Sequence, residues 1–354
     1  MDRKAVIKSL RTAHQNKSLT LYLGAGVSRA NGLPTWEQLV LAMYYSRLRE
    51  PNIGEGLRAY PNYLFSIAEW HLRQRQEPLD ISARKIRSQF DSADEFLEEL
   101  KMTLYAGFTY YDDLQTPYPG PMLEANPTLR AVTNLCKAKR GERALHAIVT
   151  YNYDSLLELA LESKDIKAQS VWKEATRLPS EEALPIYHVH GYVPIRGDGS
   201  SAEELIFTEE QYHLASHDAY SWSNLVQIQC MSSSTGLMIG LSLSDRNMRR
   251  LLDAIQKTPI QTKNYALMQE PQQQTVSEDD IHEIDENARK YYERFARSGI
   301  KTDGRVFGEI QEIVRQVERF DAKANELILR ELGVTPLWYK NHDDIPEIVA
   351  SILR

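Results

Sequence analysis

Residues 18–36 read SLTLYLGAGVSRANGLPTW, and this stretch decides the fold that the sequence predicts. It opens with an apolar, partly β-branched run, Leu19–Leu23, which is typical of a short buried strand. The glycine turn Gly24–Ala25–Gly26 follows, and helical periodicity begins again at Trp36. A strand, a glycine turn and a helix in this order bring a nucleotide phosphate against backbone N–H groups and a helix N-terminus. Arg29 stands where the common dinucleotide motif has its third glycine, so the turn alone is also compatible with a plain tight turn.

Length and composition restrict the class of protein. A chain of 354 residues with 42% hydrophobic residues can bury one large core or two modest ones. The net charge of −7 and the lack of a long Lys/Arg run argue against direct nucleic-acid binding. The charged, amphipathic N-terminus differs from a signal peptide, and no window approaches the roughly 20 apolar residues of a membrane span. We therefore expect a cytoplasmic protein without membrane contact. Cys136 and Cys230 lie far apart and are expected to be reduced, mostly buried thiols.

Strand patterns alternate with helical patterns along the chain. After Leu19–Leu23, strands are predicted at 147–150, 184–189, 236–241, 264–268 and 334–339, with a further short strand considered at 205–207. Helices are predicted at 3–15, 35–49, across 60–104, at 128–139, from about 155, from Tyr212 through Ser223 to Cys230, after 245, and at 278–297, 305–332 and 346–353. Such alternation predicts an α/β, Rossmann-like parallel sheet with helices on both faces.

The predicted domain organisation follows from these elements. Residues 1–268 form the core, with a helical insertion at about 52–140, residues 269–333 form a helical insert, and residues 334–354 add the last strand and helix. The insert at 269–333 is interpreted either as a self-association or partner surface or as packing against the sheet. The proline-rich loop Thr116–Pro127 is either a rigid connector or a mobile lid over a cleft.

Polar residues follow four of the predicted strands at the point where each strand ends. They are Gly24–Ser28, Asn152–Asp154, His190 and Ser242–Asp245. Ligands of open parallel sheets bind beyond the carboxyl ends of the strands. We therefore expect these four groups to converge on one rim.

Four motifs on this rim support a family resemblance. GAGVSRANGLPTW, TYNYD, VHG and the group Gly240, Leu241, Ser242 and Asp245 occur in the order and spacing of sirtuin-type NAD-binding domains. Over about residues 18–268, the chain resembles the divergent sirtuin-like domains of bacterial antiphage defence more than the protein deacylases. It lacks the paired Cys-x-x-Cys motifs of the deacylases, so no zinc module is expected. It also carries Thr35 and Trp36 where the deacylases have Asp-Phe-Arg, which argues against acyl-lysine chemistry.

The resemblance implies two catalytic residues, Asn152 and His190. Asn152 would position the attacking water or the ribose, although an Asn after a strand is also typical of a turn. His190 matches the family's catalytic histidine, and an imidazole that titrates near neutral pH can take a proton from water or a ribose hydroxyl. A lone histidine at the end of a strand is also compatible with a structural role. His188, two residues earlier, is expected to be buried or to support the site indirectly.

The resemblance also implies a set of NAD-binding residues. Asp154 would contact the nicotinamide amide, Ser28, Ser242 and Asp245 the phosphates and the adenosine ribose, and Arg29 a phosphate. Helix N-capping is the alternative interpretation for Asp154 and the two serines, and for Asp245, while Arg29 is also compatible with a solvent-exposed position. The expected set is Gly24, Ala25, Gly26, Ser28, Arg29, Asp154, Gly240, Ser242 and Asp245.

Together these residues imply an enzyme that uses NAD as its substrate, without a metal. The activity implied is NAD hydrolysis to nicotinamide and ADP-ribose, in an abortive-infection effector of antiphage defence. Because unrestrained hydrolysis would kill the host, control is expected through a homo-oligomer or a partner such as a HerA-like ATPase. Two alternatives remain open at this stage: a non-hydrolysing NAD or ADP-ribose sensor, and a scaffold subunit of a defence complex.

Overall fold

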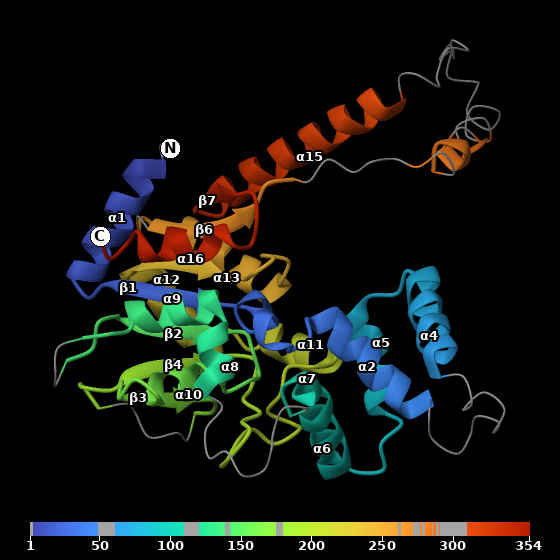
Figure 1. Ribbon diagram of the computed structural model, residues 1–354, viewed down its shortest axis with the longest axis horizontal. Coiled ribbons are helices and arrows are strands. Elements are labelled where there is room, and N and C mark those ends of the chain that lie inside the picture. The colour runs from blue at the N-terminus through green and yellow to red at the C-terminus, as the bar shows by residue number, and fades with distance from the viewer. Residues whose placement is uncertain are drawn as a thin grey trace.

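The structure is a computed structural model that describes residues 3–48, 61–109, 120–138, 142–174, 180–260, 263–271 and 310–354, with isolated positions between 277 and 290. Its centre is one seven-stranded sheet with the order β3-β4-β2-β1-β5-β6-β7, in which all neighbouring strands are parallel (Figure 1). The strands are β1 (Leu19–Leu23), β2 (Ala147–Thr150), β3 (Ala168–Val171), β4 (Leu184–His188), β5 (Thr235–Ile239), β6 (Lys263–Gln269) and β7 (Val334–Tyr339). The α/β, Rossmann-like prediction is therefore confirmed.

Strand β1 occupies the middle of this sheet. All five of its residues are buried, because helices cover both faces of the sheet. Leu21 pairs with Ile148 of β2 on one side and with Leu237 of β5 on the other. The chain builds one half of the sheet after β1 and the other half from β5 onward, so the strand order reverses at β1. This reversal is the switch point where parallel α/β sheets bind their ligands.

Two helical layers bury the two faces of the sheet. One core contains Leu21 and Ile148 together with side chains of α1 (Arg3–Gln15), α9 (Pro127–Leu135), α10 (Leu156–Glu162) and α16 (Asp344–Ala350). The other contains Tyr22 and Val149 together with side chains of α12 (Trp222–Ser233), α13 (Arg246–Gln256) and the end of α15 (Ile310–Glu331). Adjacent residues of each strand thus face opposite cores, as the pleat requires.

A separate group of helices lies to one side of the sheet, beyond the end from which the chain leaves β1 (Figure 1). It comprises α2 (Trp36–Leu48), α4 (Pro61–Arg75), α5 (Leu79–Arg87), α6 (Ala93–Leu104), α7 (Ala106–Thr109) and α11 (Glu209–His217). Helix α2 begins as predicted, since Thr35 Oγ1 accepts from the Gln38 amide while the Gln38 side chain accepts from the Thr35 amide. Helix α2 packs against α4, α5 and α6, and α5 packs against α11.

Four local predictions are wrong. Residues 205–207 form no strand: Leu205 and Phe207 are fully buried in an irregular segment, which explains their apolar character. The helix predicted from Tyr212 to Cys230 is divided into α11 and α12, because the Asn224 side chain donates to the carbonyls of Ala215 and Asp218 where α11 ends. The proline-rich stretch contains a helix, α8 (Gly120–Ala125).

The fourth error is an omission. Strand β3 was not predicted because AQSV is short and mostly half-buried, and its conformation depends on edge pairing with β4. Strand β5 also ends at Ile239, earlier than expected. Residues 116–119, most of 278–297 and residues 305–309 lie outside the described residues.

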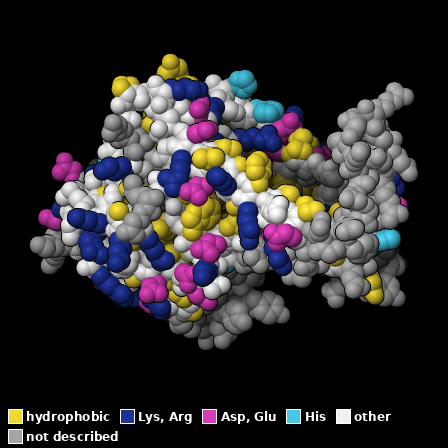
Figure 2. Space-filling model, turned by 90° about the horizontal axis from the view of Figure 1, so that it is seen from above, with side chains coloured by type: hydrophobic (Ala, Val, Ile, Leu, Met, Phe, Trp, Pro, Cys, Tyr) yellow, Lys and Arg dark blue, Asp and Glu magenta, His cyan; other side chains and the backbone are white. Residues whose placement is uncertain are grey.

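The surface is mixed in charge. On the face in Figure 2, Lys and Arg side chains are interspersed with Asp and Glu, and apolar side chains reach the surface between them. Within the described ranges, every helix is too short or too polar to cross a membrane.

Candidate active site

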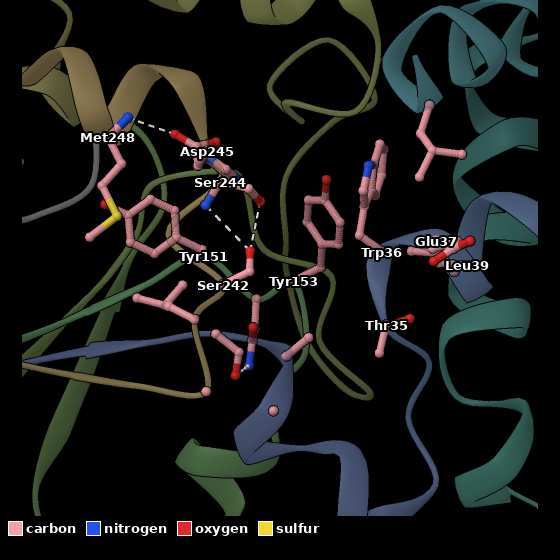
Figure 3. A pocket seen from close by; sticks show the side chains of 18 of the residues that line it. Thr35, Trp36, Glu37, Leu39, Tyr151, Tyr153, Ser242, Ser244, Asp245 and Met248 are labelled. Atoms are coloured by element: carbon pink, nitrogen blue, oxygen red, sulfur yellow. Dashed lines mark hydrogen bonds and ion pairs between the residues drawn. The ribbon is translucent and has the colours of Figure 1, made fainter. Parts of the chain in front are cut away.

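A cleft of about 1010 Å³ opens between the carboxyl ends of the strands and the separate group of helices. Figure 3 shows Trp36 on the helical side of this cleft and Tyr151, Ser242 and Asp245 on the sheet side. Every site residue expected from the sequence lines the cleft: Gly24, Ala25, Gly26, Ser28, Arg29, Asn152, Asp154, His190, Gly240, Ser242 and Asp245. The structure thus brings residues from four separate strand ends together.

The glycine turn packs directly against the loop that follows β5. The Gly24 amide donates to the Ile239 carbonyl at 3.0 Å, and the Gly26 amide donates to the Gly240 carbonyl at 3.1 Å. A Cβ on Gly24 would lie 2.5 Å from the Gly240 oxygen, and one on Gly26 would lie 2.7 Å from the Gly240 Cα. Glycine is therefore required here by close backbone packing, and the chain continues from the turn as two 3₁₀ turns, Ala25–Val27 and Arg29–Asn31.

A hydrogen-bonded chain connects Asn152, Ser28 and Asp154. The Asn152 side-chain amide donates to the Gly24 carbonyl at 3.1 Å and to Ser28 Oγ at 3.4 Å. The Ser28 hydroxyl donates in turn to Asp154 Oδ2 at 2.9 Å, and Asp154 Oδ1 accepts from the Leu156 amide at 3.0 Å. Asp154 therefore accepts a hydrogen bond from a backbone amide at the start of α10, and it also orients the Ser28 hydroxyl. The amide nitrogen of Asn152 is committed to the glycine turn, which fixes the rotamer of its side chain.

The electrostatics of Asp154 follow from its burial. Removal from water raises the pKa of this carboxyl to about 6, while the hydrogen bonds from Leu156 and Ser28 lower it in part. The carboxyl of Asp154 therefore changes its charge about one pH unit below neutrality.

His190 lies on the sheet side of the cleft, close to an acidic partner. Its Nε2 is 3.5 Å from Asp245 Oδ2, and the rings of Tyr151 and Tyr212 meet it edge-on at 5.0 and 5.8 Å. Burial lowers the pKa of His190, and the Asp245 carboxylate opposes this effect. Burial thus favours the neutral form, in which one ring nitrogen is a free base. Gly191 follows with a φ of +103°, and a Cβ there would lie 2.5 Å from a Leu205 methyl group.

His188 is the last residue of β4, two residues before His190, and its environment differs from that of His190. Its Nε2 lies 2.6 Å from Glu158 Oε1, and its Nδ1 lies 3.2 Å from the Asn152 carbonyl oxygen. Only 1% of His188 is exposed. It therefore supports the backbone of Asn152 from behind the cleft.

The loop after β5 supplies hydroxyl groups and a helix N-terminus. Ser242 and Ser244 are exposed, with their hydroxyl oxygens 2.7 Å apart. Asp245 is the N-cap of α13, since its Oδ1 accepts from the Met248 amide at 2.6 Å (Figure 3). Arg29 is exposed beside the glycine turn. Backbone amides, hydroxyls and Arg29 make this side of the cleft suitable for phosphate groups.

Sequence analysis missed the aromatic lining of the cleft, which comes from Trp36, Tyr151, Tyr153 and Tyr212. Two of these rings are anchored at their hydroxyls: Tyr151 donates to Gln227 Oε1 at 2.6 Å and Tyr153 to the Ile206 carbonyl at 2.7 Å. The alternation in TYNYD is a signal for Tyr151 and Tyr153, because they flank Asn152. Trp36 ends the motif GAGVSRANGLPTW, but the motif does not indicate that its ring lines the cleft, and Tyr212 belongs to no motif. Among the described residues, no cluster of three or more His, Cys, Asp or Glu side chains is placed to hold a metal ion.

The fold and the site together define a parallel α/β domain with a cleft at the switch point of its sheet. Residues 146–293 match the family model of the SIR2-like domain. The matched range contains β2 to β6 and, with them, Asn152, Asp154, His190 and Asp245. This match supports a sirtuin-like domain in that part of the chain, and the SIR2-like family includes NAD-processing enzymes. A comparison with curated proteins found no match.

Proposed function

We propose that this chain is an NAD glycohydrolase that converts NAD and water into nicotinamide and ADP-ribose. The observation that carries the proposal is the meeting of the Gly24–Gly26 turn, Asn152 and His190 in one cleft of a SIR2-like domain. A glycine turn packed closely on the loop after β5, a fixed amide and a buried imidazole are the parts that the proposed dinucleotide site uses.

The reaction balances without a metal or a redox step. The bond between the ribose C1′ and the nicotinamide nitrogen breaks, and its electron pair neutralises the pyridinium. A water oxygen forms the new bond to C1′, and its proton passes to a base and then to solvent. The chain's task is to hold the dinucleotide, to place the water and to accept the proton.

His190 is the base in this proposal and Asn152 is the positioning amide. Because burial keeps the His190 imidazole neutral, a lone pair is available near pH 7. The Asn152 amide nitrogen is held by the Gly24 carbonyl, so its Oδ1 is left to orient a water or a ribose hydroxyl. Because the Gly24 and Gly26 amides already donate to the Ile239 and Gly240 carbonyls, the phosphate contacts in this proposal come from Ser242 and Arg29.

Release of nicotinamide from NAD, followed by chromatography, tests this proposal. We expect His190→Ala and Asn152→Ala to lose at least a hundredfold in kcat, as typical for an acid–base group. His217→Ala is the matched control, since His217 is an exposed histidine at the end of α11 outside the cleft. If both cleft variants hydrolyse NAD at the parent rate, the site assignment is wrong. If the parent binds NAD tightly but never turns it over, a non-hydrolysing sensor is the better conclusion.

We further propose that NAD depletion serves antiphage defence and that assembly controls it, with a second copy or a HerA-like ATPase as partner. The support is the resemblance to defence domains and an exposed apolar stripe on α15. This stripe consists of Ile313, Val317, Phe320 and Leu327, whose spacing follows one helix face and of which Phe320 is 75% exposed. The native mass of the particle, alone and with candidate partners, tests the assembly. We expect Phe320→Glu to reduce it, and an unchanged mass would remove α15 from the interface.

A further inference from the structure

The carboxylate of Asp245 performs two tasks that the sequence does not distinguish. Its Oδ1 accepts the Met248 amide and thereby caps α13, while its Oδ2 faces His190 Nε2 at 3.5 Å. The side chain of Asp245 is 14% exposed and that of His190 is 8% exposed, so water screens this pair only partly. A cap on an eleven-residue helix gives the carboxylate a fixed position from which to act on the imidazole.

The resemblance implied contacts of Asp245 with the phosphates or the adenosine ribose, and of these the phosphate contact fits this geometry less well. A carboxylate carries the same sign of charge as a phosphate and offers no donor. Its two oxygens are already directed at an amide and an imidazole. The neighbouring hydroxyls of Ser242 and Ser244 are exposed and suit a phosphate better.

We propose that Asp245 is a positioning residue for His190: fixed as the cap of α13, its carboxylate orients the imidazole through Nε2 and stabilises the imidazolium that forms when His190 takes a proton. The kinetic part of this inference rests on the proposed NAD hydrolysis. The structural part does not, because it concerns only two side chains of the free protein.

The tautomer follows from this arrangement. A carboxylate facing Nε2 favours the form with the proton on Nε2, which leaves the basic lone pair on Nδ1. The other groups around the ring do not compete for this role. Tyr151 follows β2, Tyr212 lies on α11, and burial raises the phenol pKa of both, so they stay neutral over the range in which a histidine titrates. In the part of the chain that the structure describes, Asp245 is thus the charged group that faces His190.

Asp245→Asn tests the proposal cleanly, because Asn is as good an N-cap as Asp and keeps the shape of the side chain. NMR of the imidazole signals, with His190 assigned through His190→Gln, gives the pKa of His190 in the full chain without substrate. We expect that pKa to fall by about one unit in Asp245→Asn, since an opposite charge close by typically shifts a pKa by that amount or more. An unchanged His190 pKa would overturn the proposal, whether or not the protein hydrolyses NAD.

Kinetics supply the second readout. In Asp245→Asn we expect kcat near pH 7 to fall about tenfold with KM within about twofold, and the acidic limb of the kcat profile to move to lower pH. Asp245→Glu should recover part of the rate, because it returns the charge. If Asp245→Asn instead loses thermal stability and raises KM while the acidic limb stays in place, Asp245 is only a cap and the proposal fails. If the parent protein releases no nicotinamide, the proposed function fails, while the NMR titration still decides the role of Asp245.

Discussion

The two walls of the cleft are built in different ways. The sheet wall consists of short segments that follow β1, β2, β4 and β5. Hydrogen bonds between these segments fix it, such as Gly26 to Gly240 and the buried bond from Ser28 to Asp154. The helical wall consists of side chains on α2, α5 and α11, among them Trp36 and Tyr212. Helices α2 and α5 bury apolar side chains in the same core, and exposed ion pairs such as Arg84 with Glu209 connect α5 to α11.

This difference indicates that the two walls have different roles, one in the reaction and the other in substrate fit. Each reacting group of the proposed mechanism belongs to the sheet wall, where strand pairing and hydrogen bonds between the loops fix the backbone. The helical wall closes the cleft with aromatic surface, which determines what fits rather than what reacts. Substitutions on the sheet wall should therefore affect folding and kcat, and substitutions on the helical wall should affect mainly KM.

The largest effect is expected where the two loops of the sheet wall touch. Gly24→Val would place a branched side chain against the Gly240 carbonyl and Leu241, and neither backbone can move without breaking strand pairing. We expect a loss of about 3 kcal/mol in the free energy of unfolding, measured by urea denaturation, together with loss of NAD binding. Gly197→Asn is the control, because Gly197 has open space around it and Asn tolerates its positive φ. Equal losses in both variants would show that the close packing of the two loops is unimportant.

The second effect concerns the buried carboxyl of the sheet wall. Asp154 has a pKa of about 6 in the folded protein, above its ordinary value of 3.8, so between these values the folded state binds more protons than the unfolded state. The contribution of Asp154 to stability is therefore greatest at low pH and is lost as the pH rises through 6. From pH 4.5 to 7 this loss amounts to about 2 kcal/mol.

Asp154→Asn should flatten that dependence, as seen from urea denaturation at several pH values. Asp198→Asn, at an exposed position, should leave the slope of the parent unchanged. If the free energy of unfolding changes over this pH range by the same amount in the parent, in Asp154→Asn and in Asp198→Asn, the assigned burial effect is contradicted.

The sequence predicts the sheet wall well because strands and turns are local features. The runs at 19–23 and 147–150 have the bounds that the structure gives them, and polar residues placed after a parallel strand must lie at one edge of the sheet. The helical wall could not be predicted in this way. Whether Trp36 and Tyr212 face the cleft depends on how α2 and α11 pack against α5, and helical periodicity gives a buried face without naming its neighbour. Asp245 illustrates the limit: its cap was among the predicted alternatives, but its distance to His190 required the fold.

A moderate effect on the KM for NAD is expected when an aromatic side chain of the helical wall is removed. Trp36 meets the Phe207 ring edge-on at 4.8 Å and presents its remaining surface to the cleft. We expect Trp36→Ala to raise the KM for NAD about fivefold, or about 1 kcal/mol, while kcat stays within about twofold. Trp36→Phe should keep most of the affinity because it retains the aromatic contact. A loss in kcat as large as that of His190→Ala would place Trp36 among the reacting groups and remove the distinction between the two walls.

The smallest effect is expected at the ion pairs that connect α5 and α11. Arg84 lies 3.4 Å from Glu209 and 3.9 Å from Glu210, but its side chain is 53% exposed, so water screens these attractions. We expect Arg84→Ala to change the free energy of unfolding by less than about 1 kcal/mol and to leave the KM for NAD unchanged, because exposed ion pairs contribute little. Arg84→Lys should be indistinguishable from the parent, since both retain the charge at this exposed position. A clear rise in KM for Arg84→Ala alone would mean that the ion pairs set the position of α11. Charge would then position the helical wall, as we propose that the charge of Asp245 positions His190.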